Sequence, residues 1–73
     1  MNNGAIPEII LEDEHGFTHV SAFTRKHGIT TLQQLAGYQF GDLWKMDGYN
    51  LYVQNDIIDI ARKHGIEHTL KYD

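Results

Sequence analysis

Hydrophobic positions in this chain recur mostly at intervals of three and four residues, which is the spacing of one face of an α-helix. The first such face comprises Phe17, Val20, Phe23 and His27. This pattern predicts a helix that begins at Phe17 or Thr18, with the Thr18 hydroxyl as a candidate N-cap.

The pentapeptide Arg-Lys-His-Gly-Ile occurs at residues 25–29 and again at residues 62–66, and each copy is typical of a helix end. Basic side chains in a last turn face the negative end of the helix dipole. A glycine after that turn can adopt the left-handed conformation, and the next apolar residue can fold back on the helix. We therefore expect Gly28 and Gly65 to end two helices, with Ile29 and Ile66 packed on their last turns. The flanking sequences do not match, so this is no duplicated unit.

The last helix is predicted to run from about Leu51 to His64, with Leu51 and Ile58 at the margins of its apolar stripe. The centre of that stripe has offsets of four, three and one: Val53, Ile57, Ile60 and Ala61. No segment between Phe17 and Ile66 alternates like a long strand. The sequence therefore predicts an all-α, compact bundle of four to five short helices.

Two shorter helices are predicted between the pentapeptides. A capping box formed by Thr30 with Gln33, or by Thr31 with Gln34, would begin the first of them. Its apolar face and its end are given by Leu32, Leu35, Ala36 and Gly37. Asp42 is a candidate cap for the second, and residues 47–50 have the composition of a turn. The residues of its apolar face would be Leu43, Trp44 and Met46.

The N-terminal region differs from the rest in composition. Residues 1–5 are polar or small, and residues 6–11 combine Pro7 with a short apolar run, which suggests a brief extended arm. We expect residues 1–11 to form a partly flexible arm and residues 12–73 a single helical binding domain. The longest apolar run has three residues and no apolar leader is evident, so we expect a cytoplasmic protein.

Charge and composition disfavour several kinds of chemistry. The formal charge is −4, whereas domains held to nucleic acid by their overall field are usually basic. Cysteine is absent, and the histidine pairs four residues apart flank glycines, so we predict no metal and no cofactor. Asp56, Asp59 and Lys63 are expected on a solvated face with an Asp59–Lys63 pair, and residues 12–14 as a solvated acidic cluster. We predict that the chain is not an enzyme, because no nucleophilic or phosphate-binding motif is present.

A longer pattern follows the first pentapeptide. It consists of Gly-Ile-Thr-Thr-Leu at residues 28–32, Leu35, Asp-Leu-Trp-Lys-Met at residues 42–46, a tight turn, and a helix over residues 57–66 that ends in Gly-Ile. This pattern resembles the C-terminal domain of the bacterial RNA polymerase alpha subunit. Leu43, residues 46–50 and Ile57 are also similar to the helix-hairpin-helix family. Both resemblances imply a small SAM-like helical domain.

The polymerase resemblance also implies a set of DNA contacts. In that family an Arg and an Asn of the first helix reach the minor groove, and a glycine, lysines and a serine begin the last helix. The candidate positions on the first helix here contain no Arg: Thr18, His19, Ser21, Ala22 and Thr24. At the last helix the chain has Asn50 as a cap, but Leu51, Tyr52 and Val53 replace the cations that strengthen phosphate binding. The resemblance therefore implies a shared fold, whereas most of the family's DNA-contacting residues are absent from this chain.

Two surface features remain as candidates for binding. Phe40 and Trp44 are expected in the core, whereas Tyr49 and Tyr52 fit packing and partner contact equally well. The basic residues at the two helix ends either complement the helix dipoles or, if they lie on one side, form a single positive patch.

We therefore predict a non-enzymatic binding module whose protein partner contacts Tyr49, Asn50 and Tyr52. The resemblance makes the transcription machinery the first partner to consider. The alternative is a DNA-binding module of helix-hairpin-helix type that uses helix starts and basic helix ends: Ser21, Arg25, Lys26, Asn50, Arg62 and Lys63.

Overall fold

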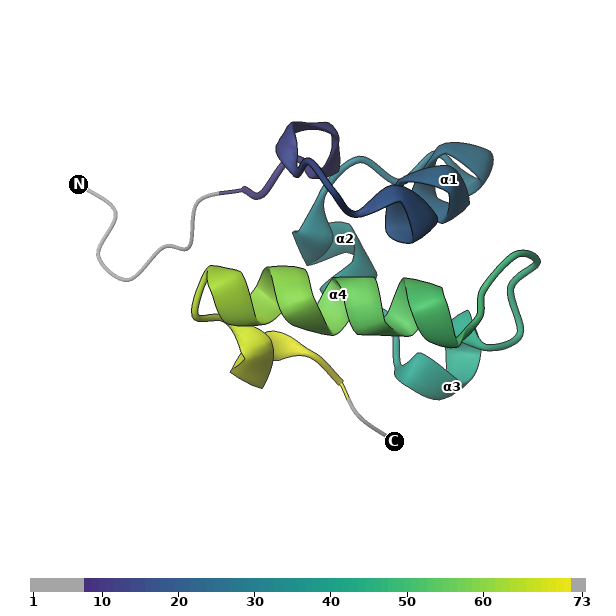
Figure 1. Ribbon diagram of the computed structural model, residues 1–73. Coiled ribbons are helices and arrows are strands. Elements are labelled where there is room, and N and C mark those ends of the chain that lie inside the picture. Colours follow the sequence, from purple (N-terminus) through teal and green to yellow (C-terminus); the bar gives the residue numbers. More distant parts are fainter. Residues whose placement is uncertain (1–7, 72–73) are drawn as a thin grey trace.

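The longest helix, α4 (Leu51–Lys63), runs through the middle of the molecule, and the other elements lie around it (Figure 1). The computed structural model describes residues 8–71, and over this range the protein is an all-α bundle. The remaining elements, in chain order, are η1 (Leu11–Asp13), α1 (Thr18–His27), α2 (Leu32–Ala36), α3 (Phe40–Leu43) and η2 (Glu67–Thr69). Within the described range, no helix is both long and apolar enough to cross a bilayer.

The apolar stripe of α4 is the centre of the core. The four residues predicted at the centre of the stripe are all buried: Val53, Ile57, Ile60 and Ala61. The side chains of Ile57 and Ile60 are fully enclosed. Full burial of one such side chain stabilises a fold by about 1.5–3 kcal/mol. The most extensive contact of α4 is with α1, which contributes Val20 and Phe23. The smaller elements then close the core, and the predicted role of Phe40 as a core residue is confirmed.

Both pentapeptides end helices as predicted. Gly28 and Gly65 adopt left-handed backbone conformations, with φ of 69° and 70°. The N–H of Ile29 donates to the Thr24 carbonyl at 2.9 Å, and the N–H of Ile66 donates to the Ala61 carbonyl at 2.8 Å. Each isoleucine is buried against the helix that it follows, so the left-handed glycine and the apolar residue act together as a helix-ending motif.

The start of α1 agrees with the prediction, but its predicted cap does not. Thr18 is the first helical residue rather than the cap, and Phe17, at the cap position, makes no side-chain capping bond. The carboxylate of Asp56, on α4, instead accepts a hydrogen bond from the Val20 N–H at 3.2 Å. A free donor at the start of α1 is thus satisfied by another helix. The expectation that Asp56 lies on a solvated face is therefore wrong.

The two short helices begin in different ways. Thr31 and Gln34 form a complete capping box at the start of α2, which confirms one of the two predicted alternatives. Asp42, the predicted cap of α3, lies within the helix, which starts at Phe40 after Gln39. At this start the Phe40 N–H donates to the Lys71 carbonyl at 3.1 Å, a partner distant in the sequence.

The segment before α1 belongs to the folded domain. Ile9 and Leu11 are buried in the core, and an antiparallel bridge joins Ile10 to Thr31. Among the described residues, Ile9 and Leu11 of the predicted arm are thus packed in the core. The predicted flexibility of residues 1–7 lies outside the described residues.

We expect Gly28→Val and Gly65→Val each to lower the free energy of unfolding by more than about 1 kcal/mol, since a β-branched residue resists positive φ. Denaturant unfolding of the purified variants measures this. The matched controls are Gly28→Asn and Gly65→Asn, which should be tolerated better because asparagine enters the left-handed region more readily. Equal stabilities for the valine variants and the native chain would contradict the helix-ending role.

Candidate functional site

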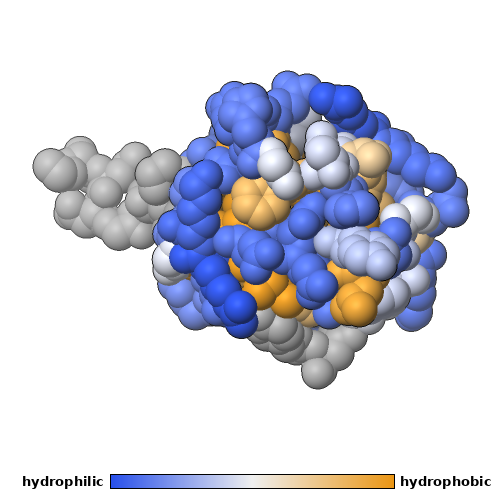
Figure 2. Space-filling model, in the orientation of Figure 1, coloured by the Kyte–Doolittle hydropathy of each residue, from blue (hydrophilic) through white to orange (hydrophobic). Residues whose placement is uncertain are grey.

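Three large apolar side chains are exposed where α3 ends and α4 begins. Trp44 is 47% exposed, Leu51 is 56% exposed and Tyr52 is 64% exposed. We call these three residues the aromatic surface. Figure 2 shows the side of the molecule on which α4 lies, where hydrophobic side chains interrupt a mainly hydrophilic exterior. Exposed apolar side chains that gather in this way are typical of contact surfaces.

Specific contacts hold two of these side chains in place. The Trp44 indole Nε1–H donates to the Gln54 Oε1 at 2.8 Å, which fixes the ring beside the first turn of α4. The Tyr52 ring stacks on the His19 ring of α1, with centroids 5.0 Å apart and an interplanar angle of 25°. Leu51 is the first residue of α4 and is more than half exposed. The aromatic surface therefore lies at the end of α3 and on the first turn of α4, and His19 of α1 supports its Tyr52 ring.

Tyr49 lies beneath the aromatic surface instead of forming part of it. Its side chain is in the core, with only 8% of the residue exposed, and its ring meets Phe23 and Trp44 edge-on at centroid distances of 5.2 and 5.0 Å. Its hydroxyl donates to the Gln54 Oε1 at 3.4 Å. Burial raises the pKa of Tyr49 to about 12. Two roles were considered for Tyr49, and packing is the one observed. Its predicted role as a partner contact is corrected accordingly.

Asn50 is committed to a structural role at the same end of α4. Its Oδ1 accepts a hydrogen bond from the Val53 N–H at 3.0 Å, so the side chain caps the helix. Asn50, Lys26 and His19 line a shallow hollow of about 230 Å³ between α1 and the start of α4. The structure thus brings together two of the candidate nucleic-acid-binding residues, Lys26 and Asn50.

Of the two interpretations of the basic helix ends, the single positive patch is not observed, because the two ends lie at opposite ends of α4. The Lys26 ammonium pairs with Asp47, which precedes the start of α4, and lowers the pKa of that carboxyl. Arg62 and Lys63 lie at the opposite end of α4, a helix about 20 Å long. They pair with Glu67 at 3.0 Å and Glu14 at 3.1 Å.

The remaining basic candidate, Arg25, lies on a different side of α1 from Lys26. Arg25 is exposed, and together with Ser21 it lines a second hollow, of about 210 Å³, that borders η1. The predicted pairing of Lys63 with Asp59 is wrong, since Lys63 turns to Glu14 instead. The six candidate nucleic-acid-binding residues are therefore spread over three places.

Sequence reasoning missed two members of the aromatic surface. Leu51 was expected to widen the core stripe, but it precedes Val53 by two positions, or about 200° around the helix, which turns it to solvent. The helical phase could have revealed this. Trp44 was expected in the core, and no feature of the sequence indicated that Tyr49 would take the inner position.

No three His, Asp or Glu side chains within residues 8–71 gather in an arrangement that could hold a metal ion. No protein-family model, curated protein or solved structure matches the chain. The candidate site is therefore described by its own geometry: an exposed apolar surface with a buried tyrosine beneath it.

We expect Tyr49→Ala to lower the free energy of unfolding by about 3–5 kcal/mol, as for other large aromatic residues removed from a core. The matched substitution Tyr52→Ala should change it by less than about 1 kcal/mol, because the Tyr52 ring is exposed. Urea unfolding followed by circular dichroism measures both values. Similar losses for the two variants would contradict the division between an inner and an outer tyrosine.

The buried hydroxyl of Tyr49 also predicts an alkaline effect. Its pKa is about 12 in the folded protein and near the ordinary value of 10 when unfolded, so ionisation favours the unfolded chain. Its contribution to stability is complete below pH 10 and is lost as the pH rises from 10 towards 12. Unfolding curves should show a steeper loss over this range for the native chain than for Tyr49→Phe. Parallel losses would contradict the assignment.

Proposed function

We propose that this chain is a non-enzymatic protein-binding module and that its partner docks on the aromatic surface. The observation that carries this proposal is the joint exposure of Trp44, Leu51 and Tyr52 at one end of α4. Tryptophan and tyrosine are enriched among the residues that dominate binding energy, because they offer a large apolar area with a polar group.

The rigidity of the aromatic surface supports the same proposal. Trp44 is held by its hydrogen bond to Gln54, and Tyr52 by its stacking on His19. Immobilising a flexible side chain in an interface costs about 0.5–1.5 kcal/mol, and rings that are already held lose less freedom on binding. The aromatic surface is therefore preorganised for binding a partner.

The proposal extends to the class of domain. The observed order of helices and the two left-handed helix ends accord with the fold expected from the resemblance to the polymerase alpha C-terminal domain. We therefore propose that fold for this chain and name the transcription machinery as the first partner to test. This step depends on analogy of fold, which assigns no activity by itself.

A second candidate function is DNA binding through the hollow between α1 and α4. The observation in its favour is that Lys26, Asn50 and His19 line this one hollow. Against it, the Lys26 ammonium is already paired with Asp47, and the chain carries a formal charge of −4. Phosphate binding depends on cations that can release counterions, so we favour the protein partner.

The proposal is tested by affinity capture from a bacterial lysate, followed by binding measurements with the purified candidate. We expect Trp44→Ala and Tyr52→Ala each to weaken binding at least about tenfold, as expected for residues at the centre of an interface. Tyr38→Ala is the matched control, because Tyr38 is an exposed tyrosine outside the aromatic surface. The affinity of the Tyr38→Ala variant for the partner should stay within about twofold of the affinity of the native chain.

Titration with duplex DNA at low salt separates the two functions. Tight binding that weakens steeply with salt and with Lys26→Ala, but not with Tyr52→Ala, would replace the protein-binding proposal by the nucleic-acid one. We expect no such binding in the concentration range where the protein partner binds.

A further inference from the structure

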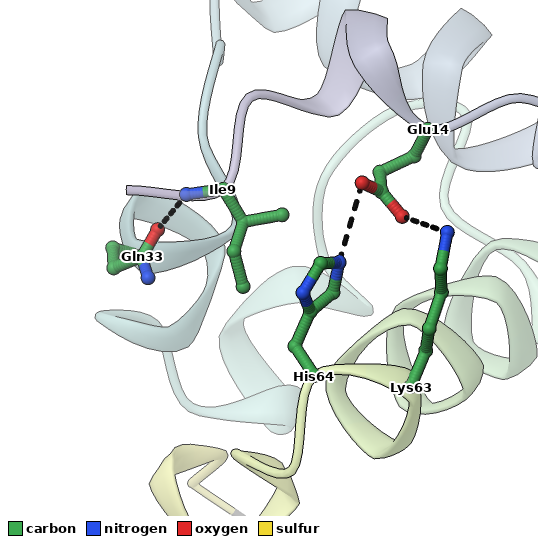
Figure 3. A network of polar contacts seen from close by, with 5 residues as sticks. All are labelled: Ile9, Glu14, Gln33, Lys63 and His64. Carbon is green, nitrogen blue, oxygen red and sulfur yellow. Dashed lines mark hydrogen bonds and ion pairs between the residues drawn. The ribbon is translucent and has the colours of Figure 1, made fainter. Parts of the chain in front are cut away.

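The segment from Ile9 to Glu14, which we call the strap, lies across the bundle and joins regions that are distant in the sequence. The Leu32 N–H at the start of α2 donates to the Ile9 carbonyl, and the Leu11 N–H donates to the Thr30 carbonyl, both at 2.9 Å. The Ile9 N–H donates to the Gln33 Oε1 at 2.9 Å (Figure 3). The side chains of Ile9 and Leu11 are buried beneath it.

The last residue of the strap is tied to the C-terminal end of α4. The Glu14 Oε1 accepts from the Lys63 Nζ at 3.1 Å, and the Glu14 Oε2 lies 3.2 Å from the His64 Nε2 (Figure 3). Only 8% of the Glu14 side chain is exposed. The predicted solvated acidic cluster is therefore wrong at this position, because Glu14 is enclosed between two basic groups.

Other features of the strap make it separable from the helices. A hollow of about 210 Å³, lined by Leu11, Glu12 and residues of α1, borders it on one side. Its only regular element is the single turn of η1, whereas α1 and α4 share the most extensive contact of the domain. Gly16, with a φ of 90°, follows the strap and precedes α1. Local opening of one segment costs less free energy than unfolding of the whole domain.

We propose that the strap opens as a unit while α1 and α4 stay folded, and that the Glu14 carboxylate is the latch that keeps it closed. Opening removes Ile9 and Leu11 from their places in the core and leaves the Leu32 N–H without its acceptor. The strap is thus a conformational device that joins the N-terminal segment to the end of α4. It is independent of the aromatic surface, which lies at the other end of that helix.

The charges around Glu14 fix the direction of its pH dependence. Burial opposes its ionisation, but hydrogen bonds from Lys63 and His64 and their attraction outweigh burial, so the pKa of Glu14 is lowered from 4.5. The neighbouring titratable groups on its own segment are Glu12, Asp13 and His15. A lowered carboxyl pKa contributes stability that is complete above the unfolded value. The latch therefore holds above pH 4.5 and weakens as the pH falls through the folded pKa.

Amide hydrogen exchange measured by NMR tests the proposal on the full chain. At neutral pH, the amides of Leu11 and Leu32 should exchange faster than those of Ile57 and Ile60, relative to their intrinsic rates. Glu14→Gln keeps the shape and removes the charge. It should accelerate exchange at Leu11 and Leu32 by at least about tenfold and leave Ile57 and Ile60 unchanged.

Two comparisons separate the latch from a general loss of stability. Lys63→Met, which removes one latch partner, should act like Glu14→Gln, whereas Lys26→Met removes an ion pair at the other end of α4 and should have no effect on the strap amides. Below pH 4.5, the protection at Leu11 and Leu32 should fall in the native chain but not further in Glu14→Gln. Exchange of all four amides at one common opening rate, or unchanged exchange in Glu14→Gln, would overturn the proposal.

Discussion

The burial of one face of α4 is the constraint on which the rest of the structure depends. A chain of 73 residues without cysteine has no disulfide to reinforce it, so a single continuous core must stabilise it. The helix α4 is the longest of the described helices and buries a stripe of several turns in such a core. The helix α1 makes the most extensive contact with α4, and η2 packs against α4 as well.

The sequence predicted the parts of the fold that depend on local chemistry. The ends of α1 and α4 follow from Gly28 and Gly65, because few other residues adopt a left-handed conformation easily. The start of α2 follows from a side chain and a backbone N–H three residues apart. The groups that satisfy the free N–H donors at the starts of α1 and α3 could not be predicted in this way, since they are the Asp56 carboxylate and the Lys71 carbonyl. Those partners are distant in the sequence.

The candidate site shows the same division. Tyr49 and Tyr52 are three positions apart and looked equivalent in the sequence, yet one is buried and the other is largely exposed. Their difference arises because Tyr49 precedes α4 and folds inward against Phe23, whereas Tyr52 is on the helix and beside α1. The side on which each ring lies is decided by tertiary packing. The sequence places these rings near the start of α4 without assigning them to the interior or the surface.

Gln54 has a consequence for what the aromatic surface can recognise. An indole nitrogen is only a donor, so the atom of the Gln54 amide that faces Trp44 must be the oxygen. The same oxygen also accepts the Tyr49 hydroxyl, which commits both of its lone pairs to the protein itself. The amide orientation is thereby fixed, and its NH₂ group is directed away from both rings. A partner's carbonyl oxygen docked at this point would therefore meet a hydrogen-bond donor whose direction is set by Trp44 and Tyr49.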